Sequence, residues 1–240
     1  EIRMRFNFRN VSPDQIDAED ERFRISTPEP VDDLAEAIRR IGLLYPPILC
    51  EADPDRYVIV GGFKRIGACR RLGWNTIEAR IIPGNMPACD CLHIAIADNA
   101  FYRPLNLIEQ SAAVLKLAAF YNRDAELSRA AAISGMTVSP ELAAKLKQVS
   151  MLSAELRKSI LSGAISLNIA LVIDAMASPL AERLMMVFDQ LRPTLNQQKQ
   201  MVEWVKDLAR RDPAASSDLL ADQACRKILA DDELDRPRKI

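Results

Sequence analysis

The sequence predicts an α+β domain followed by an all-helical region. Three observations lead to this prediction. Short apolar runs of strand length, bounded by turn residues, occur within the first 100 residues. From about residue 105 onward, apolar residues recur at helical spacing with almost no strand signal. The chain has 240 residues and is 49% hydrophobic, which is enough to fill one large core or several small ones.

The first predicted elements are a strand and a helix. Apolar and polar side chains alternate over residues 3–9, as in a half-buried strand whose inner side carries Met4, Phe6 and Phe8. Residues 30–41 place apolar side chains along one helical stripe, and a glycine follows as the helix terminator.

Three further strands are predicted in the same part of the chain. Residues 47–50 and 57–60 are apolar runs joined by a polar turn, and residues 77–82 form a third run that ends at a Pro-Gly pair. Because strands and helices are mixed along this stretch, we expect one α+β domain over residues 1–100.

The segment after the second of these runs has the composition of an anion-binding turn. Gly61 and Gly62 allow a sharp turn and a close approach to a ligand, and a helix is expected to begin at about Phe63. Free amides at that helix start, together with Lys64 and Arg65, form a site suited to phosphate. No acidic residue occurs in this helix or in the strand before it. The Walker and dinucleotide glycine patterns are absent, and a plain surface helix after a glycine turn stays the alternative.

The helical region contains a second candidate site. A helix, a glycine turn and a second helix over residues 127–149 have the size of a helix-turn-helix unit. Ser139 is the expected N-cap of the second helix. Lys145 and Lys147 on its exposed side, and Arg129 on the preceding helix, are the expected DNA contacts. The local charge excess is small, so plain helix packing stays open as the other interpretation.

The last segment is helical as well. Two apolar stripes predict the core of a small bundle, with an exposed part available for dimerisation: Leu184, Val187, Phe188 and Leu191 form the first, and Met201, Trp204, Val205 and Leu208 the second. We therefore expect three parts, covering residues 1–100, 101–177 and 178–240.

Charge, apolar run length and cysteine content bear on DNA binding, membrane insertion, redox compartment and metal binding. The net charge of −1 gives no global attraction to nucleic acid, so any DNA contact must come from a local patch. No apolar run reaches the length of a membrane span. The five cysteines are odd in number and scattered, which favours a reducing cytoplasm. Cys89, Cys91 and His93 lack the spacing of a zinc motif.

Three segments resemble, in their order and spacing, the sequence boxes of the ParB family of chromosome and plasmid partition proteins. The first, read as Gly-Leu-x-Gln-Pro-Ile in the family, is matched here by Gly42, Leu43, Pro46 or Pro47, and Ile48. The second, Gly-Glu-Arg-Arg-x-Arg-Ala, is matched in kind by Gly62, Lys64, Arg65 and Ala68. The third, Glu-Asn-x-x-Arg followed by Leu-Asn-Pro-Ile-Glu, is matched by Asp98, Asn99, Leu105, Asn106, Ile108 and Glu109.

The chain also departs from these boxes. Tyr45 replaces the glutamine of the first box, and Phe63 and Gly67 replace the glutamate and the third arginine of the second. Arg103 lies one position later than the family arginine. The chain is thus similar to a divergent member of the family, over about residues 23–175.

The resemblance implies a nucleotide site, a metal site and a partner. It implies that CTP, or another nucleoside triphosphate, binds with Mg²⁺. It assigns the phosphates to Gly61, Gly62, Lys64 and Arg65, with Pro46 and Pro47 beside them, and the metal to Asp98 and Asn99. It also implies DNA as the partner of the helix-turn-helix residues and a homodimer as the assembly. The alternative for Asp98 and Asn99 is a helix C-terminus, where Asn often takes a left-handed conformation.

The resulting hypothesis is a DNA-binding protein of ParB type with a nucleotide pocket, acting in partition or in transcriptional regulation. The alternative is a nucleotide-dependent enzyme on the same ParB/sulfiredoxin fold: a nuclease, a kinase or a weak NTPase. Sulfiredoxin-type repair chemistry is not expected, because Phe63 stands where sulfiredoxins carry their reactive cysteine. A third possibility is an adaptor that has lost nucleotide binding, given Phe63 and Gly67.

Overall fold

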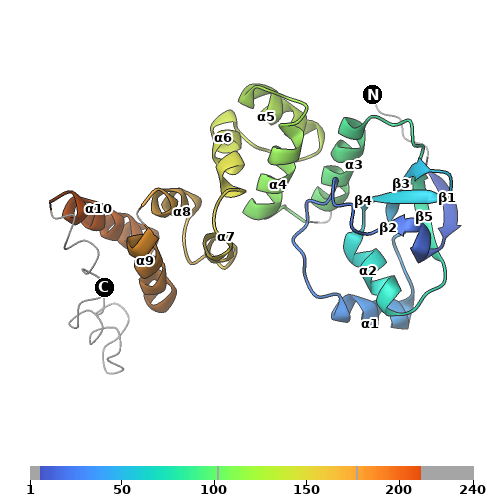
Figure 1. Ribbon diagram of the computed structural model, residues 1–240, viewed down its shortest axis with the longest axis horizontal. Helices are drawn as coiled ribbons and strands as arrows, with labels where there is room; N and C mark the ends of the chain where they lie inside the picture. Colours follow the sequence, from blue (N-terminus) through green and yellow to red (C-terminus); the bar gives the residue numbers. More distant parts are fainter. Residues whose placement is uncertain (1–5, 102, 177, 212–240) are drawn as a thin grey trace. The chain divides into compact units, whose positions relative to one another are not determined.

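The computed structural model of the protein describes residues 6–101, 103–176 and 178–211 (Figure 1). The chain forms two compact units that are divided between Lys147 and Gln148. The first unit contains the sheet and the helices as far as α6, and the second contains α7 to α10. The fold class is α+β, as predicted. No helix in the described part of the chain has both the length and the apolar character that a bilayer span requires.

The sheet of the first unit has five strands in the order β1-β5-β3-β4-β2. Its strands are β1 (Asn7–Val11), β2 (Ile16–Asp17), β3 (Ile48–Asp53), β4 (Arg56–Gly61) and β5 (Ile77–Ile82). The pairs β1–β5 and β3–β4 are antiparallel, whereas β3–β5 and β2–β4 are parallel. The expected strand at residues 3–9 overlaps β1, which pairs with β5 from Asn7, opposite Ile81, and continues to Val11; residues 3–5 lie outside the described residues. Phe8, expected on the inner side, is 60% exposed.

Helices cover both faces of the sheet. Helices α1 (Asp32–Ile41) and α2 (Phe63–Arg71) lie over one face and α3 (Ala88–Ala100) over the other (Figure 1). Tyr57 and Ile59 of β4 join the core under α1 and α2, while Val58 and Val60 join the core under α3. This two-sided burial explains why β4 is a continuous apolar run rather than an alternating one.

Three more helices complete the first unit. They are α4 (Leu107–Leu117), α5 (Asp124–Ile133) and α6 (Pro140–Val149). The core under α3 continues into these helices through buried residues such as Val114, Leu127 and Leu146. Within residues 127–149, where a helix-turn-helix unit was expected, the chain forms the end of α5 and the whole of α6, which pack on the core shared with α3 and α4. A helix-turn-helix function of this pair stays a prediction.

The second unit is helical throughout its described part. Its helices are α7 (Ala154–Leu161), α8 (Leu167–Asp174), α9 (Ser178–Leu191) and α10 (Leu195–Arg211). The α9 stripe is buried as expected, with Leu184 and Phe188 fully enclosed. The prediction for the α10 stripe is only partly correct. Val205 is buried as expected, but Trp204 is 59% exposed, and Val202 is buried in its place. Residues 212–240 of the expected third part lie outside the described residues.

Candidate functional site

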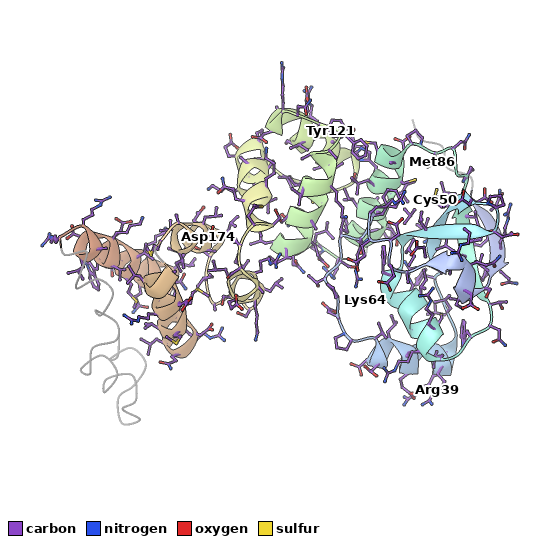
Figure 2. All side chains as sticks on the ribbon, in the orientation of Figure 1. Arg39, Cys50, Lys64, Met86, Tyr121 and Asp174 are labelled. Carbon is purple, nitrogen blue, oxygen red and sulfur yellow. The ribbon has the colours of Figure 1, made fainter. Side chains whose placement is uncertain are left out.

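A cavity of about 320 Å³ lies in the first unit where β4 passes into α2. Its lining includes Gly62, Lys64, Arg65, Asp98, Asn99 and Arg103. The first turn of α2 and the last turn of α3 therefore meet at one hollow, which brings part of the predicted phosphate-binding set together with the predicted metal-binding pair. Gly61, Pro46 and Pro47 are not among its lining residues. Figure 2 shows Lys64 near the start of α2.

The two glycines are required by the close approach of neighbouring groups. A Cβ atom on Gly61 would lie 2.8 Å from Oδ2 of Asp98. Gly62 has a φ of +92°, and a Cβ there would lie 2.9 Å from Cβ of Pro47. Because side chains rarely adopt this φ and cannot occupy these distances, the turn is specific to glycine. Pro47 thus lies beside the turn, and its role in phosphate binding stays a prediction.

The start of α2 is open to an anion. Gly62 is the N-cap and has no side chain to accept from the first amides of the helix, and the first turn contains no acidic residue. Unpaired amides at a helix start carry a partial positive charge. Lys64 forms an ion pair with Glu29, whose side chain is 54% exposed. Lys64 therefore lines the cavity in an ion pair that solvent screens, and a bound phosphate can take the place of Glu29 as its partner.

Asp98 is the most constrained polar side chain of the cavity. It is 10% exposed, and it accepts from Arg65 at 2.9 Å on one oxygen and from Arg80 at 3.1 Å on the other. Arg65 and Arg80 also donate to backbone oxygens of the loop before β3, including that of Pro46. This network joins α2, α3 and β5 around the glycine turn. The sequence analysis missed Arg80, because a single arginine in an otherwise apolar strand carries no motif signal.

Asn99 does not terminate α3 in a left-handed conformation. Its side-chain amide donates to the carbonyl of Ala95 at 2.7 Å, and the helix continues to Ala100. Positive φ values at non-glycine positions occur, within the described residues, at Asp55 and Arg192 only. The left-handed alternative for Asn99 is therefore wrong. The described part of the chain contains no group of three or more metal-ligating side chains, and a Mg²⁺ contact by Asp98 and Asn99 stays a prediction.

The third sequence box has a structural role at the start of α4. Asn106 caps this helix by accepting from the amides of Ile108 and Glu109. Glu109 is 1% exposed and accepts two hydrogen bonds from Arg103, at 2.6 and 2.7 Å. Arg103 thus lines the cavity while its guanidinium is held by a buried carboxylate.

The only histidine of the chain takes part in a buried hydrogen-bond network between helices. Nδ1 of His93 lies 2.6 Å from Oγ of Ser134, and Nε2 lies 3.3 Å from the hydroxyl of Tyr121. Sγ of Cys89 lies 3.5 Å from the same hydroxyl. Desolvation by burial lowers the pKa of His93 below its usual value of 6.5. These residues connect α3 to α5 and to the segment after α4.

The candidate DNA-binding residues are distributed over α5 and α6. Ser139 accepts from the amide of Leu142 at 3.2 Å, which fits its expected role as N-cap. Lys147 forms a 2.7 Å ion pair with Asp124 of α5. Arg129 and Lys145 are exposed. The structure brings these residues to two adjacent helices but ties one of the cations to an acidic neighbour.

Comparison with known protein families identifies the first part of the chain. Residues 4–100 match the ParB N-terminal domain. A nucleoid occlusion protein of Bacillus cereus (strain B4264) is 32% identical over 92 residues, which are 38% of this chain and 31% of that protein. A nucleoid occlusion protein of Bacillus anthracis (strain A0248) is 30% identical over the same length. The chain thus spans about a third of the length of these curated relatives.

Solved structures of related proteins align with larger parts of the chain. ParB from Caulobacter crescentus, C-terminally truncated and complexed with CTP-γ-S, is 25% identical, with a TM-score of 0.35 over 75% of this chain and 99% of the other. The same protein complexed with the centromeric parS site is 21% identical, with a TM-score of 0.46 over 81% of this chain and 98% of the other.

The ParB N-terminal match covers the β4–α2 turn, Asp98 and Asn99, which are the residues that build the cavity described above. The sequence boxes and the match therefore agree on the same segment. The chain therefore carries a ParB N-terminal domain at residues 4–100.

Proposed function

We propose that this chain is a nucleotide-binding protein of ParB type that acts on DNA. The observation that carries the proposal is the Gly61–Gly62 turn, which opens α2 toward a cavity lined by Lys64 and Arg65. A glycine turn, free helix amides and two cations in one hollow form a recurrent binding arrangement for phosphate groups. CTP is the first nucleotide to test, because the second sequence box resembles that of CTP-binding ParB proteins.

The DNA part of the proposal rests on the ParB N-terminal match and on α5 and α6. The curated relatives carry the name nucleoid occlusion protein. Helices α5 and α6 are successive helices that carry Arg129, Lys145 and Lys147, and we propose that they act as a helix-turn-helix unit. Phosphate contacts position a protein without specifying sequence, so we expect weak binding unless a homodimer doubles the contacts.

A hydrolytic function receives little support from the cavity. Asp98 is the carboxylate among the lining residues, and both of its oxygens are paired with arginines. A general base needs a lone pair within reach of the water that it activates. We therefore place nucleotide binding, rather than turnover, at the centre of the proposed function.

The test is calorimetric titration of the full chain with CTP, ATP and GTP, with and without Mg²⁺ and DNA. The double variant Lys64→Ala, Arg65→Ala should lose most of the affinity, because each charge-assisted hydrogen bond contributes about 1.5–3 kcal/mol. Arg71→Ala is the matched control, since Arg71 lies on the same helix, pairs with Asp32 and does not line the cavity. Unchanged nucleotide affinity in the folded double variant contradicts the proposal.

A further inference from the structure

We propose that Tyr45 and Phe63 form an aromatic wall for the nucleoside, and that the site therefore accepts purine as well as pyrimidine triphosphates. The inference rests on the proposed nucleotide binding and adds the base preference of the site. Tyr45 belongs to the loop before β3, and Phe63 is the first residue of α2. Both line the cavity that also contains Lys64 and Arg65. Tyr45 is 57% exposed, and Phe63 is half-buried.

Both aromatic residues are anchored beside the glycine turn. The guanidinium of Arg65 donates to the backbone oxygen of Tyr45 at 2.9 Å, which ties this loop to α2. The guanidinium of Arg24 lies 5.4 Å from the ring centroid of Phe63, within the range of a cation–π contact. A triphosphate on the first turn of α2 would therefore place its nucleoside next to the ring of Phe63 and the loop of Tyr45, which Arg65 ties to α2.

These positions are two of those at which the chain departs from the boxes that it resembles. In those boxes the corresponding residues are glutamine and glutamate, which can form hydrogen bonds, whereas the rings here offer mainly apolar surface. An aromatic ring can stack on the face of any base, so its contribution depends little on which base is present. Hydrogen bonds to the edge of a base are what give strong discrimination.

The polar side chains of the cavity are largely engaged elsewhere. The amide nitrogen of Asn99 donates to Ala95, and Arg103 is held by Glu109. Asp98 is paired with two arginines. Among the described lining residues the hydroxyl of Ser26 is left beside these engaged groups, so few side chains can read the edge of a base and stacking should dominate nucleoside recognition.

The experiment is a calorimetric titration of the full chain with CTP, UTP, ATP, GTP and inorganic tripolyphosphate. We expect the four nucleotides to bind within roughly fivefold of one another, with the purines at least as tight as the pyrimidines. Tyr45→Leu and Phe63→Leu should each weaken nucleotide binding by roughly tenfold while leaving tripolyphosphate binding unchanged. Tyr45→Phe should retain wild-type affinity. Phe101→Leu is the control, because Phe101 is 86% exposed and does not line the cavity.

Two outcomes overturn the aromatic wall alone. One is a preference for CTP over both purine triphosphates of more than about twentyfold, since that ratio requires edge recognition. The other is an equal loss of tripolyphosphate and nucleotide binding in the leucine variants, which would mean that the rings only support the turn at Gly61–Arg65 and do not contact the nucleoside. If neither tripolyphosphate nor any nucleotide binds the wild-type chain, the proposed nucleotide function itself fails and the aromatic wall fails with it.

Discussion

The phosphate turn at Gly61–Arg65 and the helix pair α5–α6 are both candidate binding regions of the first unit, but they are organised differently. The turn is fixed by contacts from distant parts of the chain, including Pro47, Arg80 and Asp98. On α5 and α6 the buried residues set the packing, while the cations lie at the surface or pair locally, as Lys147 does with Asp124. Backbone geometry thus defines the first region, and side-chain charge on a packed scaffold defines the second. Substitutions should therefore affect the two regions very differently.

The largest effect is expected for Asp98→Asn. This change removes the negative charge that holds Arg65 and Arg80 and leaves two partly buried cations without their partner, which should lower the free energy of unfolding by about 3 kcal/mol. Glu36→Gln is the matched control, because Glu36 also pairs with two arginines, Arg39 and Arg40, but on an exposed helix face. That control should cost less than about 1 kcal/mol in urea unfolding. An equal decrease in the free energy of unfolding for both variants would show that burial of the Asp98 network does not contribute to stability.

The next effect tests the glycine geometry. Gly62→Ala should lower the free energy of unfolding by about 2 kcal/mol, because alanine is strained at positive φ and its Cβ would crowd Pro47 and Arg65. Gly67→Ala is the control within the same helix: its Cβ would make only an ordinary 3.6 Å contact with Val31. Since glycine is unfavourable inside a helix, this control should be neutral or stabilising by up to about 1 kcal/mol. Thermal or chemical unfolding of both variants distinguishes a required turn from a general sensitivity of α2.

A smaller effect is expected on the helix pair. Lys145→Ala with Lys147→Ala should weaken DNA binding and reduce its dependence on salt by up to about two units of logarithmic slope, roughly one for each lysine that neutralises a DNA phosphate. The fold should be unaffected, because neither side chain is part of the buried core. Fluorescence anisotropy over a range of salt concentrations measures the slope. An unchanged slope in the double variant would mean that these lysines do not contact DNA.

The smallest effect concerns pH. Burial lowers the pKa of His93 in the folded chain below 6.5, whereas the unfolded chain takes up the proton at its ordinary pKa. The unfolded state therefore binds more protons below about pH 6.5, and stability should fall as the pH drops through this value. His93 is the only histidine, so a His93→Gln variant should lose this part of the pH dependence. If urea unfolding of both proteins shows the same slope between about pH 7 and 5.5, another group is responsible.

The sequence predicted the parts of the fold that follow from local patterns. The run at residues 57–60 and the capped, periodic segment at residues 139–149 correspond to β4 and α6, because burial and helix spacing determine them directly. The two-residue strand β2 was missed, since it carries no periodicity of its own and depends on pairing with β4. Trp204 was expected on a core stripe, but which side of α10 is covered depends on tertiary packing.

The candidate site was predictable to a similar degree. The glycines and cations of one contiguous segment carried a signal, and so did the Asp-Asn pair at residues 98–99. Their convergence required the start of α2 and the end of α3 to meet at one cavity beside β4, which no local pattern encodes. The pairing of Asp98 with Arg80 was not predictable either, because it joins residues whose relation exists only in the folded sheet.

The central claim is that the start of α2 binds the phosphate groups of a nucleotide. A nitrogen-15 amide NMR titration of the full chain with inorganic tripolyphosphate, followed by CTP, tests it most directly. We predict that the largest saturable shifts in both titrations fall on the amides of Gly62, Phe63, Lys64 and Arg65, because free amides at a helix start point toward a bound anion. Saturable shifts that leave these four amides unchanged, or the absence of saturable shifts at high ligand concentration, would contradict the claim.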